Sequence, residues 1–293
     1  MITPVNLKVR MSWDKNIDTR KFFELMPYML NHFDFNDSGS QPFIMYNLSC
    51  RPGNYKRIYY TAERGRPNMK SCDWALTFTY DEDLKNPRHF RFPNYVRVGA
   101  GIDLIKTKIN VQKELQKRTK FCAFIYSNRT ATVRNKFFDK LSKYKRIDAP
   151  GKAKNNIRRL DGHKRVKKLT KYGDKINFLK QYKFCIAFEN YAERGYTTEK
   201  LYHAMKAGCI PIYWGNPLVK RDFNQNSFLY NQNKHKNLNA MLDDLVERVI
   251  QVDKDPDLYA NLIQKPWYPN NKLTKYTNPD NVIRNFKKIF GST

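Results

Sequence analysis

The chain of 293 residues is predicted to be an α/β protein with two domains. In both halves, short apolar runs typical of buried parallel strands alternate with amphipathic segments of helical period. A chain of this length can bury two separate cores, and its 41% of hydrophobic residues can fill them. The pattern is fullest from Lys183 to Gly215, where a strand, a polar turn, a helix and a second strand follow one another.

The first half is predicted to form an open α/β domain that ends near Val111. Its expected strands are 6–12, 43–47, 57–61 and 74–77. A helix is expected over 19–31, where large apolar residues recur at helical spacing. Residues 34–41 are rich in turn formers and predict a break, and the charged residues 111–119 predict a helical connector to the second domain.

The second domain is predicted to run from about residue 120 to 263. Phe184–Phe188 is an apolar run suited to a strand that is buried on both faces. Residues 197–207 favour a helix that stops at Gly208, and Cys209–Trp214 returns as another apolar strand. A unit of this kind places its first turn at the carboxyl edge of the sheet, where ligands of open α/β folds bind.

The turn and the helix that follows it contain the residues for an anionic ligand. Glu199 and Lys200 fall in the first turn of the predicted helix, and Thr198 is placed to cap it. Lysine can neutralise phosphate oxygens, and a carboxylate can accept hydrogen bonds from a ribose diol. On spacing alone, an ordinary crossover with a solvated Glu/Lys pair is an equal alternative to a nucleotide diphosphate site.

Three blocks occur here in order: FEN at 188–190, GYTTEK at 195–200 and IPIYWG at 210–215. Together they resemble the donor-binding signature of the family 10 fucosyltransferases, which make α1,3- or α1,4-fucosides from GDP-fucose. The resemblance extends over residues 56–230. Its further blocks are FCAFIYSN with RNKFFDKL (121–141), FLKQYKF (178–184), DFNQNSF (222–228), YYTAE (59–63) and DWALTF (73–78).

The resemblance implies the GT-B architecture, in which two Rossmann-like α/β domains face a cleft. It divides the chain into an acceptor-binding domain, 1–115, and a GDP-sugar-binding domain, 116–277. In similar proteins a C-terminal helix packs back on the first domain. Residues 278–293 carry apolar side chains at helical spacing and are expected to do the same.

The resemblance also assigns the donor site. Arg134 and Lys200 would neutralise the diphosphate, and Glu199 would accept hydrogen bonds from the ribose hydroxyls. The remaining predicted donor-site residues are Tyr196, for the nucleotide or sugar, Thr198, at the helix start, and Glu189 and Asn190, for the fucose or the loop. An arginine that merely extends from a helix face is the alternative for Arg134.

Glu63 is the predicted general base. It follows a hydrophobic strand, matches the position of the base proposed for the family, and could take the proton from an acceptor hydroxyl. Inversion at the sugar follows from that mechanism. The alternative is a surface glutamate beside Arg64 and Arg66, since neighbouring arginines lower a carboxyl pKa and weaken a base.

No metal or other cofactor is expected, so Mn²⁺ and Mg²⁺ should not be required. Two triplets, Asp81-Glu82-Asp83 and Asp255-Pro256-Asp257, match the DxD pattern of metal-dependent glycosyltransferases. Neither lies in the blocks that predict the donor site. In GT-B enzymes, cationic side chains and a helix dipole take the place of the metal.

The formal net charge of +28 favours an anionic partner. Eighteen Lys or Arg stand against four Asp between Arg134 and Lys183. No RNA-binding motif accompanies them, so nucleic acid is not expected. Residues 158–175 are predicted to be a basic loop that contacts an anionic membrane surface, with ordinary solvated surface as the alternative. No apolar run long enough to span a bilayer is present, and a cytoplasmic enzyme peripheral to a membrane is expected.

The leading function is therefore a GDP-fucose-dependent α1,3-fucosyltransferase acting on an acceptor such as N-acetyllactosamine or lactose. A transferase that uses another GDP-sugar is a second prediction, because Tyr191 and Gln225 depart from the family's usual residues near the sugar. A non-catalytic polyanion-binding protein on the same scaffold is the third. No pattern in the first domain distinguishes α1,3 from α1,4 linkage.

Overall fold

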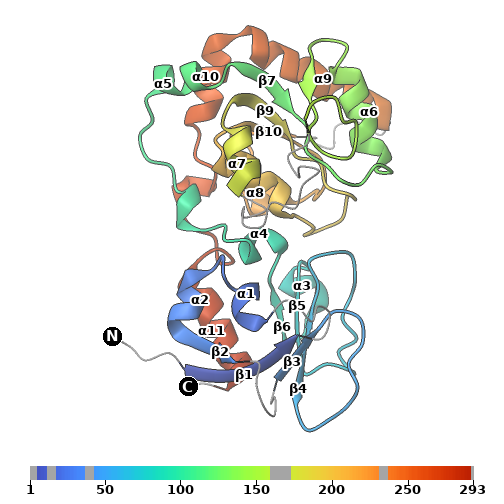
Figure 1. Cartoon of the computed structure of the whole chain (residues 1–293), viewed down its shortest axis with the longest axis vertical. Coiled ribbons are helices and arrows are strands. Elements are labelled where there is room, and N and C mark those ends of the chain that lie inside the picture. The colour runs from blue at the N-terminus through green and yellow to red at the C-terminus, as the bar shows by residue number, and fades with distance from the viewer. Residues whose placement is uncertain (1–4, 12–17, 37–42, 159–172, 231–236, 292–293) are drawn as a thin grey trace. The chain divides into compact units, whose positions relative to one another are not determined.

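A computed structural model describes residues 5–11, 18–36, 43–158, 173–230 and 237–291 (Figure 1). The described residues form two compact units. Unit 1 comprises Met1–Ile102, Arg194–Thr198 and Leu273–Thr293, and unit 2 comprises Asp103–Glu193 and Glu199–Lys272.

Unit 1 is built on a parallel sheet of six strands in the order β2-β1-β3-β4-β5-β6. The strands are β1 (Val5–Met11), β2 (Phe33–Asn36), β3 (Phe43–Tyr46), β4 (Lys56–Tyr60), β5 (Trp74–Thr77) and β6 (His89–Arg91). The helices of the unit are α1 (Thr19–Phe22), α2 (Pro27–His32), α3 (Asp81–Leu84), α4 (Asn94–Arg97) and α11 (Pro279–Phe290).

The last helix returns to the start of the chain. In Figure 1, red α11 lies beside blue α2 in unit 1. Phe290 contacts the rings of Phe33 and Phe43, and Phe286 contacts Phe23. Five buried side chains on one side of α11 explain why its apolar residues recur at helical spacing.

Unit 2 contains a parallel sheet of five strands in the order β11-β10-β9-β7-β8. The strands are β7 (Lys120–Ala123), β8 (Ile147–Asp148), β9 (Tyr182–Ile186), β10 (Ile210–Tyr213) and β11 (Leu229–Tyr230). The α-helices are α5 (Val111–Lys117), α6 (Thr132–Leu141), α7 (Gly173–Leu179), α8 (Glu199–Lys206), α9 (Leu238–Lys254) and α10 (Pro256–Gln264). Three short 3₁₀ turns are η1 (Ile102–Leu104), η2 (Val219–Arg221) and η3 (Pro269–Asn271).

The strand order of unit 2 reverses beside β7. From β7 the chain moves to β8 on one side, and it then returns to place β9 on the other side. In open parallel sheets, ligands bind beyond the carboxyl ends of the two strands that flank such a switch point. The segments after β7 and β9 are therefore the ones to inspect for a site.

The predicted α/β class is confirmed by the two parallel sheets, and β5 has the bounds predicted for it. The single helix predicted over 19–31 is wrong: Pro27 opens α2 as a separate helix, because proline lacks the N–H that α1 would need to continue. The break predicted at 34–41 is also wrong in its first residues. Residues 33–36 form β2, which pairs in parallel with β1, whereas 37–41 lie outside the described residues.

The observed units differ from the predicted division at residue 115. Residues 103–115 belong to unit 2. Tyr202 donates a hydrogen bond to Asp103, and the backbone N–H and carbonyl of Lys106 form two hydrogen bonds with the Asn271 side chain. Residues 194–198, predicted in the second domain, pack within unit 1. The acceptor and donor roles of the two domains stay predictions.

Candidate active site

The first cation of the candidate site in unit 2 is Arg134, on the helix that follows β7 along the chain. Arg134, in the first turn of α6, is 1% exposed, and its guanidinium lies 4.0 Å from the centre of the Tyr126 ring. The Tyr126 hydroxyl donates to the carbonyl oxygens of Ile186 and Phe188, at 2.9 and 3.1 Å. Arg134 Nη1 donates to Oδ1 of Asn190 at 2.9 Å. An aromatic face and an amide just after β9 thus orient a buried guanidinium.

A second cation lies at the start of α8. Lys200 Nζ is 3.4 Å from Oε2 of Glu189, whose side chain is fully buried, and 3.5 Å from Oε1 of Glu199. Gly215 makes room for this arrangement, because a Cβ at that position would stand 2.5 Å from Cγ of Glu189. A buried carboxylate of this kind needs a cation nearby, and Lys200 provides it.

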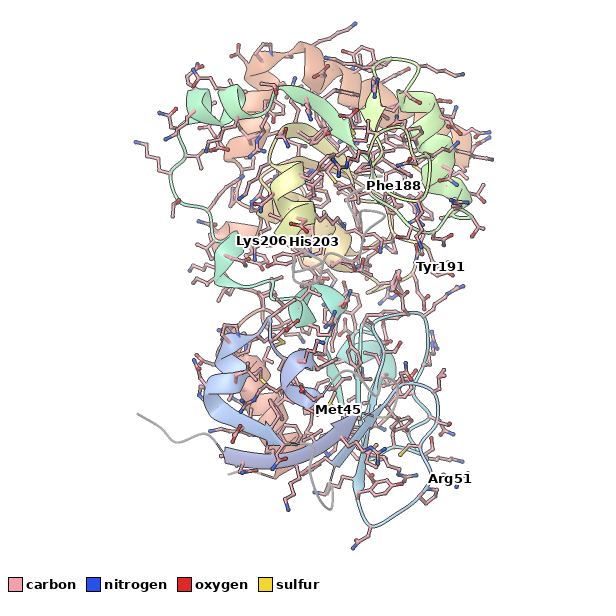
Figure 2. The ribbon with its side chains drawn as sticks, in the orientation of Figure 1. Met45, Arg51, Phe188, Tyr191, His203 and Lys206 are labelled. Carbon is pink, nitrogen blue, oxygen red and sulfur yellow. The ribbon has the colours of Figure 1, made fainter. Side chains whose placement is uncertain are left out.

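Figure 2 helps to locate these residues. Phe188 and Tyr191 flank the Glu189–Asn190 pair after β9, and His203 and Lys206 lie on α8. Five predicted donor-site residues are therefore gathered around the switch point of unit 2: Arg134, Glu189, Asn190, Glu199 and Lys200.

The charges around α8 act on one another. Burial by itself would raise the pKa of Glu199, but the ammonium groups of Lys200 and Lys175 outweigh it and bring that pKa down to about 2. Lys175 comes from α7, which packs against α8, and burial lowers its own pKa. Burial also lowers the pKa of His203 well below its usual range, so that its ring is uncharged at neutral pH.

The depressed pKa of Glu199 predicts how stability depends on pH. The folded pKa of about 2 lies below the ordinary 4.5, so the stabilisation is complete above pH 4.5 and disappears as the pH falls toward 2. The difference corresponds to roughly 3 kcal/mol. Glu199→Gln should flatten the fall in unfolding free energy over that window, as measured by urea unfolding at a series of pH values. Glu247→Gln, an exposed position on α9, is the control, and an unchanged slope in Glu199→Gln would contradict the prediction.

In unit 1, Glu63 lies three residues beyond the carboxyl end of β4. A hydroxyl turn fixes its backbone: Thr61 Oγ1 donates to the carbonyl oxygen of Glu63 and accepts from its N–H, at 2.9 and 3.1 Å. The side chain is exposed. Its Oε2 accepts a hydrogen bond of 2.6 Å from the hydroxyl of Tyr196.

Two predicted donor-site residues, Tyr196 and Thr198, pack with unit 1. Both are buried, and Thr198 is the residue immediately before α8. Tyr196 packs edge-on against Phe78, with ring centroids 5.1 Å apart. The structure thus brings Tyr196 to the predicted base Glu63, a pairing that the sequence motifs did not indicate.

The two DxD triplets have local partners. Asp81 accepts from the backbone N–H of Arg91 and lies 3.3 Å from His89, and Asp83 forms an ion pair with Arg194. Asp255 caps α10 by accepting from the first two free N–H groups of that helix. Among the described residues, no group of three His, Cys, Asp or Glu side chains is placed to hold a metal ion.

Two residues near the unit 2 site were missed by the sequence analysis. Tyr126, which orients Arg134, stands in the block FCAFIYSN, but nothing in its spacing marks it as a partner of an arginine. Lys175 was included in the predicted basic loop 158–175, because a run of lysines has no periodicity that indicates which ones turn inward. Residues 159–172 of that loop lie outside the described residues, and 173–175 begin α7.

Two α/β units, each built on a parallel sheet with helices, are the architecture of the GT-B class of glycosyltransferases. The chain belongs to glycosyltransferase family 10, the fucosyltransferases. The sequence model described as glycosyltransferase family 10 (fucosyltransferase) C-term matches residues 115–284, more than half of the chain.

Individual relatives agree with this membership. A putative fucosyltransferase of Acanthamoeba polyphaga mimivirus is 32% identical over 63% of this chain and 30% of its own length. The α-(1,3)-fucosyltransferase of Helicobacter pylori is 32% identical over 71% of this chain and 50% of its own length. The chain therefore spans half or less of these relatives. The crystal structure of an α1,3-fucosyltransferase with GDP-fucose superposes with a TM-score of 0.74 at 25% identity, covering 99% of this chain and 91% of that one.

None of the helices in the described part of the chain combines the length and the apolar character that a membrane span requires.

Proposed function

We propose that the chain is a GDP-fucose-dependent α1,3-fucosyltransferase that moves L-fucose from GDP-β-L-fucose to O3 of GlcNAc or glucose in a glycan such as N-acetyllactosamine or lactose. The observation that carries this proposal is the pair of oriented cations in unit 2, Arg134 held by Asn190 and Lys200 held by Glu189. A diphosphate needs such compensation. The likeness to an α1,3-fucosyltransferase with GDP-fucose supports the donor.

In this proposal unit 2 binds the donor. The guanidinium of Arg134 and the ammonium of Lys200 neutralise the diphosphate and stabilise the charge that develops on departing GDP. Glu199, ionised at neutral pH because its pKa is about 2, accepts hydrogen bonds from the ribose hydroxyls. Glu189, buried and close to Lys200, keeps that lysine charged and oriented.

The chemical step uses Glu63 as the general base. Its carboxylate takes the proton from the acceptor hydroxyl while the hydroxyl oxygen attacks the anomeric carbon of fucose. The bond from that carbon to the β-phosphate oxygen breaks, and GDP leaves with the bonding electrons. Because the new bond forms on the opposite face of the sugar, the β-linked donor yields an α-fucoside with inversion.

The test is acceptor-dependent release of GDP from GDP-fucose, measured with N-acetyllactosamine, with lactose and without acceptor. Release that requires an acceptor, followed by NMR assignment of an α1,3 linkage, would establish the activity. Competition with other GDP-sugars separates the proposed donor from the alternative one. Steep salt-dependent binding to heparin, with no stabilisation by GDP and no turnover, would favour the polyanion-binding protein instead.

Metal independence is a second part of the proposal. Arg134, Lys200 and the positive N-terminal end of α8 supply the charge that a divalent ion supplies in DxD enzymes. Activity is expected to be the same in EDTA as in Mn²⁺, as measured by initial rates of GDP release after exhaustive dialysis. Loss of activity in EDTA that Mn²⁺ restores would contradict this.

Contact with an anionic membrane stays a proposal as well, supported by the net charge of +28. The full chain should co-sediment with vesicles that contain phosphatidylserine, and the bound fraction should fall as salt is raised. Vesicles of phosphatidylcholine alone are the control. Equal binding to both kinds of vesicle would exclude an electrostatic contact.

A further inference from the structure

The predicted base is held by a tyrosine from a distant part of the sequence. The hydroxyl of Tyr196 donates to Oε2 of Glu63 at 2.6 Å, a short hydrogen bond to a carboxylate. Within the described part of the chain, no other side chain forms a hydrogen bond or ion pair with the Glu63 carboxylate. Tyr196 is fully buried, whereas Glu63 is exposed, so the rigid partner of this pair is the tyrosine.

Residues 194–198, the segment that carries Tyr196, are held in unit 1 by contacts of Arg194 and Gly195. Arg91 Nη2 donates to the carbonyl oxygen of Gly195 at 3.1 Å, and Arg194 pairs with Asp83 through two hydrogen bonds. Gly195 has a φ of +80°, and a Cβ there would stand 2.4 Å from the carbonyl oxygen of Phe78. Only glycine fits this close approach, which explains why glycine precedes the tyrosine.

Arg91 is itself firmly fixed. It is 4% exposed, its Nε donates to the carbonyl oxygen of Phe78, and its guanidinium lies over the rings of Tyr80 and Tyr276, at 4.2 and 4.5 Å. A buried arginine with this many contacts has little freedom. The carbonyl of Gly195 and the ring of Tyr196 are thus parts of one rigid arrangement with β6 and α3.

We propose that Tyr196 is a positioning residue for the base: it fixes one oxygen of Glu63 and directs the other toward the acceptor hydroxyl. This inference rests on the proposed function. An exposed glutamate otherwise rotates among several rotamers, and a base must lie within hydrogen-bond reach of the proton that it removes. The bond to Tyr196 restricts that rotation from the side of a buried, rigid ring.

The same residue connects the base to the donor site along the chain. Glu199 and Lys200, the first residues of α8, follow Tyr196 by three and four residues. The GYTTEK motif therefore serves two purposes: its first residues, Gly195 and Tyr196, hold the base in unit 1, and its last two belong to the diphosphate site of unit 2.

Tyr196→Phe tests the proposal, since it removes the hydroxyl and keeps the ring. We expect kcat for GDP-fucose and N-acetyllactosamine to fall by about tenfold to a hundredfold, the cost of losing a hydrogen bond to a charged group. Affinity for GDP, measured by calorimetry, should stay within about twofold. KM for N-acetyllactosamine should also stay within about twofold, so that the loss appears in kcat alone.

Three measurements separate positioning from stability. Tyr46→Phe removes another buried hydroxyl of unit 1, which donates to the carbonyl oxygen of Ser71, and it should leave kcat unchanged. Carboxyl-carbon NMR of protein labelled in glutamate, with the Glu63 signal assigned from Glu63→Gln, reports the hydrogen bond from Tyr196 without substrate. That signal should shift in Tyr196→Phe and stay in place in Tyr46→Phe. The double variant should lose no more activity than Glu63→Gln alone.

Several outcomes would overturn the proposal. A Tyr196→Phe variant with the kcat of the wild type would show that the hydroxyl does not position the base. Weaker GDP binding with an unshifted Glu63 signal would make Tyr196 a donor contact instead. If the wild type shows no turnover with any acceptor, the proposed function fails and this inference fails with it, whereas turnover that is insensitive to Tyr196→Phe removes the inference alone.

Discussion

Glu63→Gln is expected to lower kcat by about a thousandfold, within the range observed when a general base is removed. The amide keeps the shape of the side chain and can still accept from the Tyr196 hydroxyl, but it cannot take the acceptor proton. GDP affinity should not change, because the cations of the proposed donor site belong to unit 2. The measurement is GDP release under saturating donor and acceptor, combined with calorimetry of GDP binding.

The control for Glu63→Gln is Glu24→Gln, which neutralises another exposed glutamate of unit 1. It should have wild-type kcat and GDP affinity. A Glu63→Gln variant that retains more than about a tenth of the wild-type kcat would exclude Glu63 as the base, since proton transfer by a positioned group contributes at least about a hundredfold. The proposed donor site in unit 2 would be unaffected by that result.

Lys200→Ala is expected to have the other large effect, on three quantities at once. It removes a positive charge from the proposed diphosphate site, so GDP affinity and kcat should each fall by about a hundredfold. It also leaves the buried Glu189 carboxylate without the ammonium that lies 3.4 Å away, which should cost about 3 kcal/mol of unfolding free energy. GDP calorimetry, initial rates and urea unfolding measure the three quantities.

Two variants separate the loss of function from the loss of stability. Lys183→Ala breaks another ion pair of unit 2, with the nearly buried carboxylate of Asp253, and should lower stability while GDP affinity is kept. Lys200→Arg retains the charge and should recover most of the stability and part of the GDP affinity. Wild-type GDP affinity in a well-folded Lys200→Ala protein would show that the diphosphate binds elsewhere.

Much of the fold, and the gathering of five predicted donor-site residues in unit 2, could be predicted from the sequence, because they depend on interactions that are local along the chain. Strand β5 and helix α8 follow from apolar periodicity and from residues that start or stop a helix. Glu189 and Asn190 lie three and four residues beyond the end of β9, and Glu199 and Lys200 lie at a helix start. In a parallel sheet these positions meet at one edge whatever the surrounding contacts are.

Other features could not be predicted, because the partners that create them are far apart in the sequence. Its motif predicts that Tyr196 is a donor contact. The hydroxyl of Tyr196 reaches Glu63 because Gly195 packs against Phe78 and Arg91. Asp83 belongs to a triplet that matches the DxD pattern of metal-binding enzymes, yet its carboxylate forms an ion pair with Arg194.

The sequence by itself therefore determined the α/β class, elements such as β5 and α8, and the residues at the sheet edge of unit 2, since periodicity and capping act within a few residues. The tertiary structure decided which unit residues 103–115 and 194–198 join and what holds the predicted base. Such choices depend on burial and on hydrogen bonds between distant residues, whose strength is set by the environment that the whole fold creates.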